Sequence, residues 1–247
     1  MKIALLADVH GNLEALTACL EHARDAGAEL HAFLGDLVGY GADPVAVVET
    51  IAAFARRGAI VVRGNHEQSI LDARSSRMNR DAEDAAEWTR ARLTASHLEF
   101  LAALPLVARL GDAVFVHASA ASPEEFTYVR DTFRAAESLR AARATYVLCG
   151  HVHEPTLYFT AAPGRVVPFT PTEGVPISVP RHRQWLAIAG SVGQPRDGRP
   201  AACYGMLDLH HRTLTFHRVP YDWAAAAAKM RSAGLPEVLA RRLERGE

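Results

Sequence analysis

The sequence predicts an α/β fold whose first part is built on a largely parallel sheet. Short apolar runs at residues 2–7, 30–34 and 59–63 have the length and composition of buried strands. The segments 12–26 and 44–56 lie between them, with apolar residues at helical spacing. Strands that alternate with helices indicate βαβ units and therefore parallel strand pairs.

Both predicted helices begin at recognisable residues. Asn12 precedes helix 12–26 and is expected to be its N-cap. Asp43 precedes helix 44–56 in the same way, and Pro44 occupies the first helical position.

The middle of the chain differs in character. Residues 68–103 are charged and contain no strand-like runs, so we expect two or three helices that form a helical cap insertion. A hairpin is expected over residues 107–117, followed by a helix over 131–143 and a strand over 145–149.

The last third is β-rich and ends in a helical tail over 222–245, interrupted near 234–236. Residues 168–184 are rich in Pro and Thr and predict a surface loop. No repeat or break in composition divides the chain, so we expect one domain over residues 1–247. The predicted strands lie near residues 156–161, 165–169, 185–189, 202–209 and 213–218.

Composition excludes several classes of partner. The net charge of −1 lacks the overall basic excess of a nucleic-acid binder, so a nucleic-acid partner is not expected. The apolar runs are too short for a signal-peptide core or a membrane span. Cys19, Cys149 and Cys203 show no paired spacing. These features together favour the reducing cytoplasm.

Five polar clusters stand out, and most follow directly after a predicted strand. In open α/β sheets, ligands bind beyond the carboxyl ends of the strands, so we expect the clusters to converge on one site. The clusters are Asp8-Val9-His10, Gly35-Asp36, Gly64-Asn65-His66-Glu67, His117 and Gly150-His151-Val152-His153.

The residue types in these clusters predict a metal site. Carboxylates and imidazoles together suit Mn, Fe, Zn or similar divalent ions. Asp8 and His10, like His151 and His153, are two positions apart just after a strand, so both members of each pair can face one ion if the chain turns there.

These five clusters, in this order, resemble the motifs of the calcineurin-like metallophosphoesterases. The resemblance runs from residue 2 to about 153, and it implies a four-layer sandwich of two mixed β-sheets flanked by helices. One departure is Glu67, where the family often has Asp. The stretches 8–16, 35–41 and 190–196 are similar to a prokaryotic branch of small stand-alone phosphodiesterases and dinucleoside tetraphosphate hydrolases.

The resemblance implies a centre with two divalent metal ions and a bridging hydroxide as nucleophile. Manganese is expected by analogy, although the ligands also accept Fe, Zn, Co or Ni. His66 would protonate the leaving group, and Glu67 would either orient the His66 imidazole or serve only as a polar loop residue. One ion would take Asp8, His10 and His153, the other Asn65, His117 and His151, and Asp36 would bridge them.

Three further residues are candidates for substrate binding. Arg196, in a Gly/Pro loop, has the planar guanidinium that suits phosphate, and a solvated side chain is its alternative. Asn12 either only caps its helix or also approaches the substrate. Tyr40 either stacks on a substrate base or packs in the core.

We therefore expect hydrolysis of phosphodiester or phosphoanhydride bonds, dinucleoside polyphosphates included, in a small phosphoester or nucleotide substrate. A phosphomonoesterase or protein phosphatase is the first alternative. A non-catalytic binding scaffold of the same fold is the second, and the presence of His66 and all seven ligand positions argues against it. The oligomeric state stays open, with a homodimer as one alternative.

Overall fold

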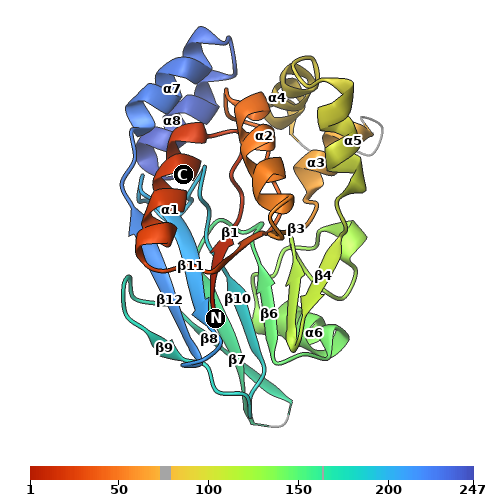
Figure 1. The fold of residues 1–247 in the computed structure, drawn as a ribbon, viewed down its shortest axis with the longest axis vertical. Helices are drawn as coiled ribbons and strands as arrows, with labels where there is room; N and C mark the ends of the chain where they lie inside the picture. Colours follow the sequence, from red (N-terminus) through yellow and green to blue (C-terminus); the bar gives the residue numbers. More distant parts are fainter. Residues whose placement is uncertain (73–78, 163) are drawn as a thin grey trace.

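A computed structural model describes residues 1–72, 79–162 and 164–247. The described chain forms two six-stranded mixed sheets flanked by helices, which confirms the expected fold class (Figure 1). In the first sheet, β1, β2 and β3 are parallel, as the sequence predicts, and the remaining pairs are antiparallel. Its spatial order is β3 (Ile60–Val61), β2 (Leu30–Phe33), β1 (Lys2–Leu6), β11 (Ala202–Asp208), β12 (Thr213–Val219) and β9 (Ile177–Ser178).

The second sheet has a parallel centre and antiparallel edges. Its spatial order is β4 (Val107–Leu110), β5 (Ala113–Val116), β6 (Tyr146–Cys149), β10 (Trp185–Ile188), β7 (Thr156–Ala162) and β8 (Arg165–Phe169). The expectation of a loop throughout 168–184 was wrong at one point. Ile177 and Ser178 form strand β9 at the edge of the first sheet, a pairing too short to leave a period-two pattern in the sequence.

The helices follow the predicted pattern, with one difference at a cap. The Asn12 carboxamide oxygen accepts a hydrogen bond from the Ala15 amide at 3.1 Å, which confirms the N-cap. Asp43 precedes its helix but makes no capping bond, because its carboxylate binds Lys229 Nζ at 2.9 Å instead. The helices are α1 (Leu13–Asp25), α2 (Pro44–Ala55), α3 (Asn65–Leu71), α4 (Arg80–Arg90), α5 (Ala95–Ala103), α6 (Thr132–Ala142), α7 (Trp223–Ser232) and α8 (Glu237–Arg245), and a 3-10 turn, η2, spans Pro123–Glu125.

The strand β1 shows how the layers are packed. Ile3 and Leu5 point into the core between the two sheets, whereas Ala4 and Leu6 point into the layer that contains α1 and α2. A strand buried on both faces reads as a continuous apolar run, as residues 2–7 do. The outer face of the second sheet is covered by α6, on the other side of the molecule from α1 (Figure 1).

The C-terminal helices complete the first helical layer. Figure 1 shows α7 and α8 beside α1. The Trp88 indole N–H donates to the Ala233 carbonyl at 3.0 Å and so ties α4 to the end of α7. Within the segment expected as a cap, residues 73–78 lie outside the described chain. Among the described residues, no helix is both long and apolar enough to cross a membrane.

Candidate metal centre

The ends of neighbouring strands bring the polar clusters together. Because β1 and β2 are parallel and in register from Ile3/Leu30 to Leu6/Phe33, the loops after them leave the sheet at one edge. The Asp8 amide donates to the Gly35 carbonyl at 3.1 Å, and the His10 amide donates to the Asp36 carbonyl at 2.9 Å. The second sheet joins this edge where the His151 amide donates to the Asp8 carboxylate, 2.9 Å from Oδ2.

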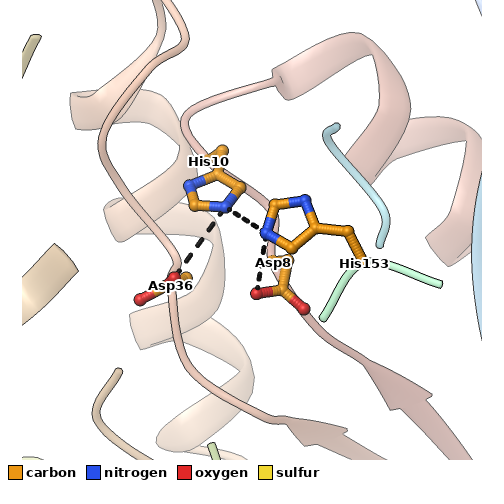
Figure 2. Close-up of side chains that lie close together, drawn as sticks. All are labelled: Asp8, His10, Asp36 and His153. Carbon is orange, nitrogen blue, oxygen red and sulfur yellow. Dashed lines mark hydrogen bonds and ion pairs between the residues drawn. The ribbon is translucent and has the colours of Figure 1, made fainter. Parts of the chain in front are cut away.

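A first group of side chains contains Asp8, His10, Asp36 and His153, all buried (Figure 2). The Nε2 atoms of His10 and His153 lie 3.2 Å apart. His153 Nε2 is 3.3 Å from Asp8 Oδ1, and His10 Nε2 is 3.9 Å from Asp36 Oδ2.

A second group shares Asp36 with the first and adds His117 and His151. His117 Nε2 lies 3.2 Å from Asp36 Oδ2 and 3.0 Å from His151 Nδ1. The Asn65 side-chain oxygen is 3.0 Å from the same His117 nitrogen. The structure thus places all seven candidate ligands in two adjoining groups with one carboxylate in common.

The hydrogen bonds of three histidine rings indicate that both groups of side chains are suited to binding metal cations. The Nδ1 atoms of His10, His117 and His153 each face a backbone carbonyl, of Val38, Leu34 and Gln194 respectively, at 3.3, 2.8 and 2.6 Å. A carbonyl only accepts, so Nδ1 carries the proton of each ring in its neutral form, and Nε2 is then the nitrogen with the lone pair. These lone pairs face one another and carboxylate or amide oxygens, an arrangement that a metal ion would satisfy.

Burial and charge set the protonation of the cluster. Burial, followed by the charges of His66 and His153, holds the pKa of His10 well below its usual value, so the ring is neutral and able to bind a metal. Burial of His117 also acts to lower its pKa, but the Asp36 carboxylate and the other partners outweigh it and raise the pKa to about 9, so a metal ion would have to displace the Nε2 proton of this ring.

The loops that carry these side chains adopt an uncommon backbone. A single non-glycine residue in the left-handed region costs on the order of 1 kcal/mol, and such residues concentrate at functional sites. Single-sequence patterns do not reveal this conformation, and we had not predicted it. The left-handed residues of the site loops are Asp8, His10, Asp36, Tyr40, His151 and His153, with φ between 50° and 69°.

Glu67 is placed differently from the expected orienting role. Its carboxylate accepts hydrogen bonds from four backbone amides, those of Asp36, Leu37, Val38 and Gly64, at 2.7–3.2 Å. No described contact joins it to the His66 ring, whose Nδ1 has no hydrogen-bond partner among the described residues. Burial, with the Asp36 charge, raises the pKa of Glu67 to about 7. Glu67 therefore holds together the two loops that bear Asp36 and Asn65.

A cleft of about 1140 Å³ opens above the two groups. Asp36, Asn65, His66, His151 and His153 line it, and Asn79 and Ala82 at the start of α4 border it. His66 Nε2 lies 4.0 Å from Asp36 Oδ2. The sequence analysis did not single out several other lining residues because they lie outside the five motifs, among them Arg63, Phe126, Tyr128 and Arg242.

The three candidates for substrate binding occupy different positions. Arg196 lines the cleft and donates to the Gln194 side chain at 2.9 Å. Tyr40 also lines it, with its ring centroid 4.5 Å from that of His10 and 4.4 Å from that of His66. Asn12 is buried, and its carboxamide N–H groups donate to the Gly193 carbonyl at 3.0 Å and to the Tyr221 hydroxyl at 3.3 Å.

Comparison with known proteins gives consistent results. The model of the calcineurin-like phosphoesterase superfamily domain matches residues 1–212. An uncharacterized protein of Methanocaldococcus jannaschii is 33% identical over 98% of this chain and 96% of its own length. The crystal structure of a metallophosphoesterase from Sphaerobacter thermophilus superposes with a TM-score of 0.87 at 36% identity, covering 100% of this chain and 99% of that one. A hypothetical protein of Pyrococcus horikoshii shares the fold, with a TM-score of 0.79 at 21% identity and coverage of 100% and 98%.

Proposed function

This chain belongs to the calcineurin-like phosphoesterase superfamily of metal-dependent hydrolases, and we propose that it hydrolyses phosphodiester or phosphoanhydride bonds of a nucleotide-sized substrate. The observation that carries the proposal is the pair of buried groups that share Asp36 beneath an open cleft.

The two groups of side chains indicate which ligands would bind each of the two ions. Asp8, His10 and His153 would hold one ion, and Asn65, His117 and His151 the other, with Asp36 between them. Manganese is the metal we expect. When bound, two divalent cations supply Lewis-acid polarisation of the phosphoryl oxygens and lower the pKa of water.

The chain itself supplies a proton donor and a charged binding surface. His66 lies on the floor of the cleft beside Asp36, where it would donate a proton to the leaving-group oxygen. Burial lowers the pKa of His66 to about 4, and an anionic substrate next to the ring would favour the protonated imidazole needed for this role.

The size and charge of the cleft support an extended anionic substrate. Pockets for drug-sized molecules are roughly 300–1,000 Å³, so about 1140 Å³ admits a nucleotide. Arg63, Arg196 and Arg242 line it, and guanidinium groups match phosphate oxygens.

The test is turnover by metal-stripped protein reloaded with manganese. We would compare bis(p-nitrophenyl) phosphate, p-nitrophenyl phosphate and diadenosine tetraphosphate, and resolve the products by chromatography. We expect metal-dependent cleavage of the diester or the dinucleotide. In His66→Ala we expect kcat to fall by about 10²–10⁴, with the bound metal content unchanged.

Two outcomes would contradict the proposal. Turnover of the monoester alone would favour a phosphomonoesterase. Two bound ions per chain with no turnover of any of the three substrates would favour a binding scaffold.

A further inference from the structure

The two ends of the cleft differ in chemistry. At one end, the Tyr128 ring is stacked on His151, with centroids 3.9 Å apart and ring planes at 23°. The Phe126 ring lies 5.9 Å from that of His117. This aromatic end, Phe126 and Tyr128, therefore borders the group formed by Asp36, His117 and His151, and 42% of Tyr128 is exposed.

The opposite end is cationic. Tyr40 packs against His10 and His66, and Arg196 and Arg242 line the cleft with it. Burial raises the pKa of the Tyr40 hydroxyl, and the charges of Arg196 and Arg242 act to lower it. We call Arg196 and Arg242 the arginine end.

Arg242 lacks the counter-ion that its neighbours on α8 possess. Arg241 pairs with Glu237 at 3.3 Å, and Arg245 pairs with Glu247 at 3.7 Å. Among the described side chains, Arg242 makes no hydrogen bond or ion pair, although it is half-buried. Such a cation in a cleft is poised for an anion from outside the protein.

Arg196 also lacks a carboxylate partner among the described residues. Its side chain donates to the neutral Gln194 amide at 2.9 Å and also bonds with the neutral Tyr40 hydroxyl, and its buried Nε is unpaired. Besides Asp36, the carboxylates that line the cleft are Glu124 and Glu125, which lie on η2, directly before the aromatic end in the chain. The arginine end therefore keeps its positive charge.

The position of His66 indicates which end of the cleft would receive the leaving group. Its ring contacts Tyr40 and His10, at the arginine end. Because His66 would protonate the leaving oxygen, the leaving group would depart toward Arg196 and Arg242. The attacked phosphoryl group and its nucleoside would then lie toward Phe126 and Tyr128. Because His151 is stacked on the Tyr128 ring and the Arg130 guanidinium lies over it at 4.6 Å, a base would contact Phe126 or the exposed edge of Tyr128.

We propose that Arg196 and Arg242 form an anion subsite that binds a phosphate carried by the leaving group. The preferred substrates are therefore phosphoanhydrides whose leaving group is a nucleotide or a polyphosphate. In the reaction, the attacked phosphorus gains the oxygen of water, and the bridging P–O bond breaks with its electron pair on the leaving phosphate. The proton that water loses balances the one that His66 delivers. This inference rests on the proposed function, and it assigns a binding residue to α8, beyond residue 212, where the family match ends.

A kinetic test compares two substrates in matched variants. In Arg242→Gln, we expect the ratio of kcat/KM for diadenosine tetraphosphate to that for bis(p-nitrophenyl) phosphate to fall about tenfold, because one charge-assisted contact to phosphate is lost. Arg241→Gln, the neighbouring arginine outside the cleft lining, should keep the wild-type ratio. An unchanged ratio in Arg242→Gln would overturn the subsite while leaving the proposed function intact.

A binding test does not depend on turnover. Calorimetric titration of the metal-free protein with inorganic tripolyphosphate should give a Kd about tenfold weaker in Arg242→Gln than in wild type or Arg241→Gln. Equal affinities in the three proteins would refute the subsite. Absence of turnover in every protein, with this difference in binding preserved, would count against the proposed function and in favour of the subsite.

Discussion

The side chains of His10, His117 and His153 show how a contact outside the cluster determines the chemistry inside it. Each Nδ1 donates to a backbone carbonyl, so Nε2 is the nitrogen through which each neutral ring can bind a metal. The carbonyls belong to Val38, Leu34 and Gln194, which no motif includes. Sequence reasoning identified the histidines but not the partners that fix their tautomers.

Glu67→Gln is predicted to destabilise the protein, because Glu67 holds two loops together. The Glu67 carboxylate accepts two amides on each oxygen, and a glutamine NH₂ group would leave two buried amides unpaired. At about 1–3 kcal/mol for each of the two unsatisfied groups, we expect the free energy of unfolding to fall by about 2–6 kcal/mol. Urea denaturation checks this, with the exposed Glu21→Gln as control. A loss below about 0.5 kcal/mol would show that the amides find other partners.

Asp208→Asn is predicted to lower the free energy of unfolding more at pH 6 than at pH 3. Asp208 is buried, which acts to raise its pKa, but hydrogen bonds from His211 Nδ1 and the amides of His210 and His211 prevail and lower it to about 2. Because the folded-state pKa lies below the unfolded value, the charged form stabilises the protein fully above about pH 4, and this contribution disappears as the pH falls toward 2.

The measurement is denaturant unfolding of wild type and Asp208→Asn at pH 6 and pH 3. We expect the variant to be less stable by on the order of 1 kcal/mol at pH 6, and the gap to narrow at pH 3. A gap that widens at pH 3 would mean that the hydrogen bonds to Asp208 do not favour its charged form.

At the scale of elements, the loops after the strands approach one another so closely that two glycine positions have no room for a β-carbon. A β-carbon on Gly64 would collide with Asp36, and one on Gly193 would collide with the Val9 carbonyl. Gly64 therefore permits the loop that bears Asn65 to lie against the shared carboxylate. No pattern in the sequence indicates which backbone each of these glycines approaches.

Gly64→Ala is predicted to weaken metal binding. The new methyl group displaces Asp36, which both groups share, so we expect the Mn²⁺ affinity to fall by about 10–100-fold, as for other changes that disturb ligand orientation. Calorimetric titration measures this affinity. Gly58→Ala is the control, because Gly58 has open space around it and its φ of +93° adds only backbone strain. Equal affinities in the two variants would exclude the collision as the cause.

For the whole molecule, the two sheets meet at the site. Asp8 follows β1 of the first sheet and His151 follows β6 of the second, and a hydrogen bond joins them. An ion held by Asp8 and His153 would be bound by one residue from each sheet, and so would an ion held by Asp36 and His117. Both ions would therefore cross-link the two sheets.

Metal removal is predicted to lower the melting temperature. A ligand at about 100 times its Kd stabilises the folded state by about 2.7 kcal/mol per site, which corresponds to roughly 5–10 °C for a chain of this size. Calorimetric scans before and after chelation, and again after manganese is restored, measure the shift. In Asp36→Asn we expect a smaller shift, because both groups lose the shared carboxylate. No shift in wild type would mean that the metals bind the folded and unfolded chains alike.

The sequence by itself determined the alternation of strands and helices in the first βαβ units and the positions of the candidate ligands, and its resemblance to a family indicated the fold class. It did so because short apolar runs that end in Asp, Asn or His carry both the strand and the polar cluster after it. Only the tertiary structure decided which ligands meet. His10 and His153 face each other across 143 residues of chain, and Arg242 reaches the cleft from α8. Local patterns encode the conformation of a segment, but contacts between distant segments depend on how the sheets and helices pack.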